Sequence, residues 1–407
     1  MDSRPFSLSS DDSPKPTEHF CDIYLMPGTI LQMPIRYKDL RLMSSSQRAM
    51  TFGAMDEATK DHVAVKYVSN LDDRELVRYT LREIKLFQRS NHPNIVKLVN
   101  VLSKSVCLRE PDVDVVYIVL EKVQASLTHV INMAKVGKHK LTQKHTSFMT
   151  YQILCGVKYL HKSGITHLDL KPDCIGVNEK GCAVKLFSFG LGQKRPDNRN
   201  MSPYVVTRFY RAPELLLEME FENKVDSWSI GAILGEMILK RVLFPGQNYF
   251  TQWTAIVTVL GKPKKDFFDK MDNKTRDFAL RTGPLPGRTI DQLFPDALIQ
   301  SEDREPINIP NARSFLSSVL KIDPTTRCTV EEALKHPYVN YWYDRAEADV
   351  PGMKDVKELE LKLLNEERSL EDYRSMLWRE LETYQRAHDV LGTERPDLAF
   401  GGYQTFI

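Results

Sequence analysis

The sequence predicts an α+β fold with two lobes: a small antiparallel β lobe that contains one key helix, then a larger, mainly helical lobe. β-prone segments gather in residues 37–69 and 115–120, whereas helical periodicity dominates from residue 127 onward. The chain has 407 residues and is 42% hydrophobic, so it can bury a full core. We therefore expect a folded protein with more than one globular unit.

The first lobe is expected to hold strands within residues 37–69, among them Val63-Ala64-Val65-Lys66-Tyr67-Val68, which polar residues bound on both sides. Helically spaced apolar residues predict a helix over residues 72–90. The apolar run at residues 115–120 is consistent with a buried strand. One helix therefore interrupts the predicted sheet.

The second lobe is expected to be helical over residues 127–161 and 226–260, with polar and proline-rich loops after them. A last segment, residues 356–391, alternates charged and apolar residues, and Ser369 with Asp372 resembles a capping box. Two interpretations of this segment stay open. The segment is either a surface helix that packs its apolar stripe on the rest of the protein, or a coiled coil that binds a partner.

The composition excludes several function classes. A formal net charge of +2 gives no reason to expect a nucleic-acid or membrane surface, so neither is expected as a partner. The six cysteines show no spacing typical of zinc or of a disulfide framework. The polar N-terminus lacks the apolar core of a signal peptide, and no apolar run spans a bilayer. We expect a cytoplasmic protein, with the nucleus as a further location.

Four motifs occur in a specific order. Val63-Ala64-Val65-Lys66 places a lysine on a strand, and Glu83 lies on the next predicted helix, an arrangement that orients nucleotide phosphates through an ion pair. Downstream follow His167-Leu168-Asp169-Leu170-Lys171-Pro172, Ser188-Phe189-Gly190 and Ala212-Pro213-Glu214. A surface lysine and a solvated acid would explain the first motif alone, but the ordered set is typical of a protein kinase.

Two further segments narrow the resemblance. Residues 202–214, SPYVVTRFYRAPE, resemble the activation segment of mitogen-activated protein kinases, and Leu243-Phe244-Pro245-Gly246 resembles a later landmark of that family. Residues 117–121 and 151–156 are similar to segments of the c-Jun N-terminal kinase subgroup. The resemblance runs from about Arg36 to about Ala387 and implies the bilobal protein-kinase fold.

The resemblance also implies an organisation and a set of site residues. It divides the chain into a disordered tail (1–30), an N-lobe (31–123), a C-lobe with the family's insert (124–343), a docking patch with a helix packing back on the body (344–391) and a second tail (392–407). Asp169 and Lys171 match catalytic positions, and Ser202 and Tyr204 match phosphorylation sites. The positions matching a nucleotide site are Met43, Thr51, Ala64, Lys66, Glu83, Leu120, Glu121 and Val123.

Both positions that hold magnesium in the family depart from its pattern. Cys174 stands where an asparagine belongs, and Ser188 stands where an aspartate belongs. A neutral thiol is a poor ligand for a hard cation, and one hydroxyl cannot replace a carboxylate. We therefore expect no metal site and no well-bound cofactor. ATP and magnesium are expected only if the chain is an active kinase.

Other parts of the phosphate-handling site depart as well. Residues 44–49, SSSQRA, replace the glycine-rich loop, and Thr51 and Gly176 replace the two apolar residues that sandwich adenine. Phe187 replaces a smaller aliphatic residue just before residues 188–190. Of the residues that would hold a phosphorylated segment, Arg82 remains, while Leu168 and Gln193 replace two others. Phosphorylation should therefore order the segment only weakly.

The docking positions of the family are retained. Asp344, Glu347 and Asp349 match an acidic patch that attracts basic residues of linear motifs. An apolar docking groove is matched by Ala125, Leu127, Val130, Met133, Val177 and Cys182. A solvated turn and an ordinary core remain the alternative explanations of these two sets.

The sequence therefore favours a pseudokinase, or a severely impaired kinase, that acts by docking pathway partners: upstream kinases, scaffolds, phosphatases and transcription-factor substrates. One alternative is an active proline-directed Ser/Thr kinase carried by Lys66, Asp169 and Lys171. The other is a nucleotide switch that binds ATP without metal through Lys66 and Glu83.

Overall fold

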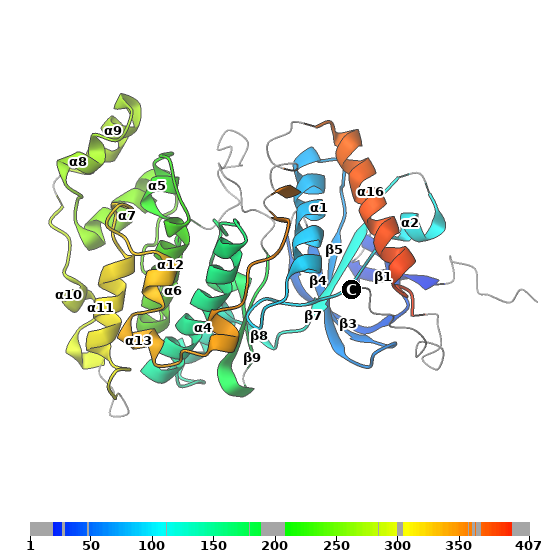
Figure 1. Cartoon of the computed structure of the whole chain (residues 1–407), viewed down its shortest axis with the longest axis horizontal. Coiled ribbons are helices and arrows are strands. Elements are labelled where there is room, and N and C mark those ends of the chain that lie inside the picture. Colours follow the sequence, from blue (N-terminus) through cyan, green and yellow to red (C-terminus); the bar gives the residue numbers. More distant parts are fainter. Residues whose placement is uncertain are drawn as a thin grey trace, which may run out of the picture. The chain divides into compact units, whose positions relative to one another are not determined.

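The structure is a computed structural model, described here for residues 19–26, 29–46, 49–110, 112–178, 180–188, 208–283, 285–298, 304–356, 358–359, 363 and 368–392. The chain divides into two compact units. The first comprises Met1–Ile84, Leu98–Lys122 and Arg368–Ile407, and the second comprises Lys85–Lys97 and Val123–Glu367. The predicted α+β class is confirmed, because antiparallel strands dominate the first unit and helices the second (Figure 1).

The first unit is built on a five-stranded antiparallel sheet of order β3-β4-β5-β7-β6. Its strands are β3 (Tyr37–Ser45), β4 (Met50–Asp56), β5 (His62–Val68), β6 (Leu98–Leu102) and β7 (Val116–Glu121). Because side chains alternate along a strand, Phe52, Val65 and Val119 share one face and are buried there in a common core. The opposite face carries Lys66.

A separate antiparallel hairpin precedes this sheet, formed by β1 (Phe20–Met26) and β2 (Thr29–Pro34). β1 lies within the segment that we expected to be a disordered tail. Its apolar residues explain the difference, because Phe20 and Ile23 pack against the buried core of the sheet. A short apolar run with a partner strand thus gains enough burial to fold.

Among the described residues, the helices that belong wholly or partly to the first unit are α1 (Arg74–Arg89), α2 (Lys104–Leu108) and α16 (Leu370–Ala387). The capping box predicted at Ser369 and Asp372 is confirmed at the start of α16. The helix lies beside β6 and α2 (Figure 1) and buries Tyr373, Leu377 and Leu381. The apolar stripe of α16 is therefore covered within this unit.

The chain after α16 is fixed to the sheet by Arg36. This side chain forms an ion pair with the buried Asp56, at 2.7 Å, and donates to the carbonyls of Asp389 and Val390 at 2.8 and 3.2 Å. Asn100 donates to the Val390 carbonyl as well, at 2.9 Å. Asp389 and Val390 thus pack with the strands of the first unit.

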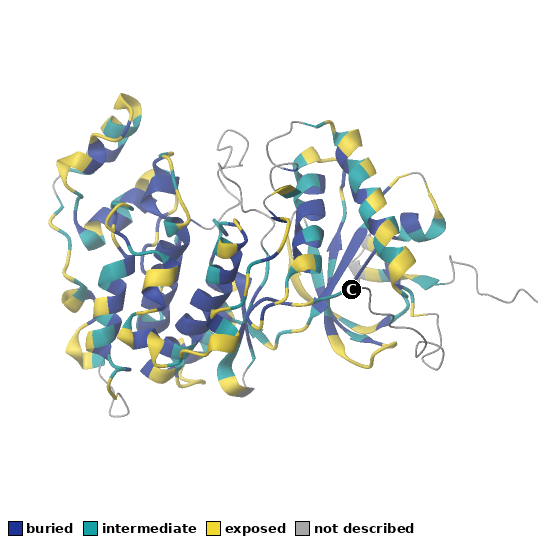
Figure 2. Ribbon diagram, in the orientation of Figure 1, coloured by how far each residue is buried: buried dark blue, intermediate teal, exposed yellow. Residues whose placement is uncertain are grey.

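The second unit is organised around α6 (Lys224–Leu239), which is buried along nearly its whole length (Figure 2). It packs against α4 (Gln143–Lys162) and α11 (Ile309–Val319). The other helices that the structure describes in this unit are α3 (Leu127–Lys135), α5 (Pro213–Leu216), α7 (Tyr249–Leu260), α8 (Lys265–Phe268), α9 (Asn273–Leu280), α10 (Ile290–Leu293), α12 (Val330–Ala333), α13 (Pro337–Asn340) and α14 (Arg345–Ala348). A small antiparallel sheet joins β8 (Ala125–Ser126), β9 (Ile175–Asn178) and β10 (Ala183–Leu186), with short 3-10 turns at Pro172–Cys174, Lys180–Cys182 and Asp296–Leu298.

The helical stretch predicted at residues 127–161 is divided into α3 and α4. Gly137 adopts φ +75°, a left-handed conformation that ends a helix and that glycine tolerates without strain. The following amide of Lys138 turns back to the carbonyl of Met133 at 2.9 Å. Residues 136–142 therefore form a loop between the two helices.

Candidate functional site

The first unit brings together the predicted lysine and glutamate. Lys66 projects from β5, and its Nζ lies 2.5 Å from Oε2 of Glu83 on α1. The Glu83 side chain is 6% exposed and that of Lys66 is 25% exposed, so water can still reach the ammonium group. This ion pair holds a partly accessible positive charge on one face of the sheet, where it can meet an anion.

The same sheet face carries most of the residues predicted to contact nucleotide. Thr51 pairs with Lys66 across β4 and β5, and Ala64 pairs with Leu120 across β5 and β7. Because cross-strand partners point to the same side, all four share this face. Met43 reaches it from β3, since its sulfur lies 3.3 Å from where a Cβ on Gly53 would be. Glu121 ends β7.

The hairpin between β3 and β4 is closed by its own serine. The backbone amide of Ser46 donates to the Ala49 carbonyl at 2.9 Å, and the Ala49 amide donates to the Ser46 hydroxyl at 3.1 Å. The intervening Gln47 and Arg48 lie outside the described residues. Backbone groups that a glycine-rich loop would direct to phosphate are thus used at this turn for contacts within the hairpin.

In the second unit, Asp169 and Lys171 form a close pair. Nζ of Lys171 donates to Oδ2 of Asp169 at 2.7 Å. Burial acts to lower the pKa of Lys171, but the Asp169 carboxylate and other nearby groups outweigh it, so the pKa is raised. The lysine therefore keeps its charge. An ammonium beside a carboxylate could position a hydroxyl group and a phosphate, which is the arrangement that the retained motif predicts.

Asp226 braces the loop that carries this pair. Its carboxylate accepts from the amides of His167 and Leu168 at 2.8 and 3.0 Å, and Nε2 of His161 lies 2.8 Å away. Leu168 has φ +65°, which is strained for a side chain of its size. The two amide contacts stabilise this strained backbone and set the direction of Asp169.

The charge state of Asp226 follows from these contacts. Burial acts to raise the pKa of Asp226, but the hydrogen bond with His161 and the charges of His161 and His167 outweigh it, so the pKa is lowered. A carboxylate with a lowered folded-state pKa stabilises the fold above its unfolded-state pKa. That stabilisation is lost as the pH falls through the lowered value.

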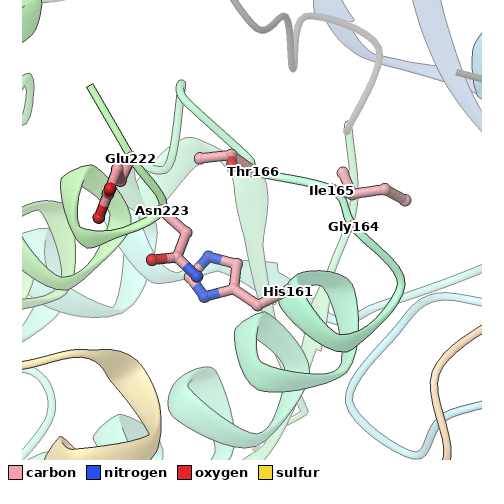
Figure 3. A pocket seen from close by; sticks show the side chains of 6 residues that line it. All are labelled: His161, Gly164, Ile165, Thr166, Glu222 and Asn223. Carbon is pink, nitrogen blue, oxygen red and sulfur yellow. The ribbon is translucent and has the colours of Figure 1, made fainter. Parts of the chain in front are cut away.

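A polar hollow of about 290 Å³ lies beside this brace (Figure 3). It is lined by His161, Gly164, Ile165, Thr166, Glu222 and Asn223. Figure 3 labels these residues, among them His161 at the C-terminal end of α4. A polar hollow therefore adjoins the Asp226 contacts near the C-terminus of α4.

Cys174 is the residue predicted to stand at the first magnesium-holding position. The side chain is buried, and its sulfur lies 3.6 Å from the backbone carbonyl of Asp169, to which it donates. Burial, with a further contribution from the Asp169 carboxylate, raises the pKa of the Cys174 thiol to about 12. The sulfur is therefore a neutral thiol at pH 7, not a thiolate, and it fits a hard dication poorly.

Ser188 occupies the second position and supplies one hydroxyl at a half-buried site. Its backbone has φ +70°, a conformation that costs a residue with a side chain some strain. Within the described part of the chain, no cluster of three or more His, Cys, Asp or Glu residues could hold a metal ion. The residues at both positions therefore do not fit a catalytic magnesium, and we derive no step through one.

Gly176, which replaces one adenine-contacting residue, is covered by Val123. A Cβ built on Gly176 would lie 2.6 Å from Cγ2 of Val123, far inside van der Waals contact. The valine side chain thus occupies the space that a larger residue at Gly176 would need. Phe187 lies in the same unit, and its amide donates to the Cys174 carbonyl at 3.1 Å. Val123, predicted as a nucleotide contact, therefore also fills a gap left by the glycine.

The activation segment is described only at its end. Ser202, Tyr204 and Gln193 lie outside the described residues. From residue 208 onward, the Arg208 guanidinium lies over the Tyr249 ring at 4.8 Å. Arg82 is buried on α1, with 1% of its surface exposed. The described end of the segment that resembles an activation segment thus contacts the first residue of α7.

The three predicted acids of the docking patch come together around α14. Asp344 is exposed and caps the helix, accepting from the Ala346 amide at 2.8 Å. Asp349 accepts from the Tyr343 hydroxyl at 2.5 Å and from Lys158 at 3.2 Å, and these two bonds lower its pKa. The sequence reasoning missed Tyr343 and Lys158, although Tyr343 directly precedes the patch.

Glu347 is the half-buried member of the patch. Burial and the nearby Asp344 carboxylate raise its pKa. A positive group bound at the patch would relieve this repulsion. The docking prediction requires that a partner supply such a positive group.

The six predicted groove residues divide into two sets. Leu127 and Val177 are 0% and 3% exposed and belong to the core, as the ordinary-core alternative expects. The half-buried set consists of Ala125, Val130, Met133 and Cys182. Only this second set offers apolar surface to a peptide without rearrangement.

Comparisons with known proteins agree with this geometry. The family model described as protein kinase domain matches residues 37–339. A protein of Suberites domuncula named stress-activated protein kinase JNK is 35% identical over 358 residues, which cover 88% of this chain and 96% of that protein. Within the described residues, no helix is both long and apolar enough to cross a bilayer. The chain therefore belongs to the protein kinase family, in the JNK-like group of stress-activated mitogen-activated protein kinases.

Proposed function

We propose that this JNK-like chain acts as a pseudokinase, or a severely impaired kinase, that works by docking linear motifs of kinase-pathway partners. The observation that carries the proposal is the buried, neutral thiol of Cys174 at a position where catalysis needs a magnesium ligand. The acidic patch of Asp344, Glu347 and Asp349 supports the docking half, because it gathers carboxylates on one small helix.

The partners that fit this surface carry basic residues followed by spaced apolar ones. The basic residues would meet Asp344 and Glu347, and the apolar ones would meet Val130 and Met133. Upstream kinases, scaffolds, phosphatases and transcription-factor substrates are the partner classes that the family implies. We place this activity in the cytoplasm and the nucleus, since such partners occur in both.

The docking proposal concerns peptides of the pattern basic-φ-x-φ, in which φ is an apolar residue and x is any residue. Loss of the acidic charge is expected to lower the affinity for such a peptide at least about tenfold, because several charge-assisted contacts disappear together. The variant Asp344→Asn/Glu347→Gln/Asp349→Asn removes charge only, since asparagine also caps helices. Fluorescence anisotropy with a labelled peptide measures the change. Lys264→Glu/Lys265→Glu, on exposed α8 residues, is the control. Unchanged affinity in the patch variant would remove the docking proposal's main support.

Two other functions have a specific observation in their favour. An active proline-directed Ser/Thr kinase is favoured by the retained pair of Asp169 and Lys171. A metal-independent nucleotide switch is favoured by the accessible Lys66 ammonium beside Glu83. Both use ATP, but only the kinase needs magnesium.

Thermal unfolding with ATP, with and without magnesium, separates these functions. We expect no ATP-dependent rise in the unfolding temperature in either condition, because a ligand stabilises only a state that binds it. A rise that needs magnesium would indicate the kinase, and an equal rise without the metal would indicate the switch. Lys66→Met serves as the matched variant, since it should abolish either rise.

A further inference from the structure

The segment from α3 to α4 concentrates positive charge. Between Leu127 and Lys162 the chain contains no Asp, Glu or Arg, and its lysines are Lys135, Lys138, Lys140, Lys144, Lys158 and Lys162. We call Lys135, Lys138, Lys140 and Lys144 the basic loop, although Lys135 ends α3 and Lys144 lies in the first turn of α4. All four are exposed, in a chain whose overall charge is only +2.

The conformation of the basic loop is fixed by backbone hydrogen bonds. The amides of Lys138 and His139 both donate to the carbonyl of Met133, at 2.9 and 3.3 Å. Gly137 makes the reversal possible through its left-handed φ of +75°. The loop is therefore held against the last turn of α3, next to the half-buried Met133 of the docking groove.

Three lysines of the basic loop have no carboxylate partner among the described residues. Within the described residues, Lys135, Lys138 and Lys144 form no ion pair, whereas Lys158 further along α4 binds Asp349. Burial, then the charges of Lys144 and Lys140, lower the pKa of His145. A positive potential therefore exists at the N-terminus of α4, where the helix dipole adds to it.

Helix α4 relates the basic loop to the acidic patch. Lys144, Tyr151 and Lys158 are seven residues apart and so lie on one face of the helix. The Tyr151 hydroxyl accepts from the amide of Asp344 at 2.8 Å, and Lys158 binds Asp349. At a rise of about 1.5 Å per residue, the acidic patch lies about 10 to 21 Å from Lys144 along the axis. An extended peptide covers that span with about three to six residues.

We propose that the basic loop binds an anionic stretch, acidic or phosphorylated, that follows the apolar residues of a docking peptide. This role of the basic loop rests on the proposed docking function and extends it. The docking surface would carry opposite charges at its two ends, with the acidic patch for positive residues at one end and the basic loop for negative residues at the other. Such a surface selects both the order and the spacing of charges in the partner. Phosphorylation of the peptide would strengthen binding by adding charge and acceptor oxygens.

A short peptide fits this surface better than a nucleic acid or an anionic membrane does. A polyanion that reached the basic loop would also approach Asp344, Glu347 and Asp349, about 10 to 21 Å away, and like charges at that distance repel at low salt. A peptide carries the two signs at its two ends. The surface therefore favours a partner whose charge changes sign along the chain.

Three labelled peptides test the proposal on the full chain. Each carries the same basic-φ-x-φ sequence, followed by a neutral tail, a glutamate tail or a phosphoserine tail. Fluorescence anisotropy should show that each anionic tail tightens binding about three- to tenfold over the neutral tail. Lys138→Glu/Lys144→Glu should abolish this gain and leave binding of the neutral-tail peptide unchanged. Glutamate in the first turn of α4 suits the helix dipole, so the variant should fold.

The control variant is Lys264→Glu/Lys265→Glu, which makes the same change of charge elsewhere in the unit and should keep the full gain. Equal affinity for neutral and anionic tails, or a gain in affinity that survives Lys138→Glu/Lys144→Glu, would overturn the role of the basic loop without contradicting the docking function. Failure of the neutral-tail peptide to bind would instead contradict the docking function. Binding of anionic vesicles or single-stranded DNA that depends on Lys138 and Lys144 would also overturn the proposal, in favour of that ligand.

Discussion

Replacing Arg327 with methionine is expected to lower the free energy of unfolding by about 3–5 kcal/mol, because it leaves a buried carboxylate without its partner. Arg327 and Glu214 are both 0% exposed, and two nitrogen atoms of the guanidinium lie 2.6 and 2.9 Å from the two carboxylate oxygens. The guanidinium also donates to the backbone carbonyls of Lys321, Ile322 and Lys224. Urea-induced unfolding followed by circular dichroism measures the loss.

Two comparisons make this expectation specific. The double variant Glu214→Leu/Arg327→Met removes both charges and should be less destabilised than the single variant. Arg386→Met, which breaks an exposed ion pair with Glu382 on α16, should lose only about 0–1 kcal/mol. If Arg327→Met unfolds at the same urea concentration as the original protein, the buried pair does not support the fold as described.

Replacing Asp226 with alanine is expected to destabilise the second unit by about 2–6 kcal/mol, since each buried donor left without an acceptor costs about 1–3 kcal/mol. The amides of His167 and Leu168 would both lose their acceptor. Leu168 would also lose the contact that stabilises its positive φ. Asp226→Asn retains an acceptor oxygen and should lose less.

Hydrogen exchange shows whether Asp226 stabilises only the loop at His167 and Leu168 or the whole second unit. The amides of His167 and Leu168 should exchange much faster in Asp226→Ala, ahead of the amides of α4. Asp266→Ala, on the exposed side of α8, is the control and should stay within about 0.5 kcal/mol of the original protein. Unchanged protection of the two amides in Asp226→Ala would contradict the bracing role.

Local patterns predicted much of the fold. The spacing of apolar residues predicted α1 within one or two residues of its ends, and the capping box at Ser369 and Asp372 predicted the start of α16. The division between α3 and α4 was not predicted, because it depends on one left-handed glycine, Gly137, inside an otherwise helical pattern. Strand β1 was missed because its stability comes from packing against distant residues of the sheet.

The candidate site was predicted at the level of residue types and only partly in its contacts. Motif order was enough to anticipate the contact of Lys66 with Glu83. Asp169 and Lys171 were predicted as site residues, but their contact with each other was not. The valine that covers Gly176 could not be predicted, because the two residues are far apart in sequence and no motif links them. The burial of Leu127 and Val177 likewise depends on tertiary packing, which a pattern of apolar residues does not specify.

The central claim is that the chain docks partners without transferring phosphate, and a phosphate-transfer assay tests it most directly. The full chain and its Asp169→Asn variant are incubated with labelled ATP, magnesium and a docking protein that carries Ser-Pro and Thr-Pro sites. We predict no incorporation above the level of Asp169→Asn, because Cys174 and Ser188 cannot hold the metal. Incorporation of label that disappears in Asp169→Asn would contradict the account and identify the chain as an active kinase.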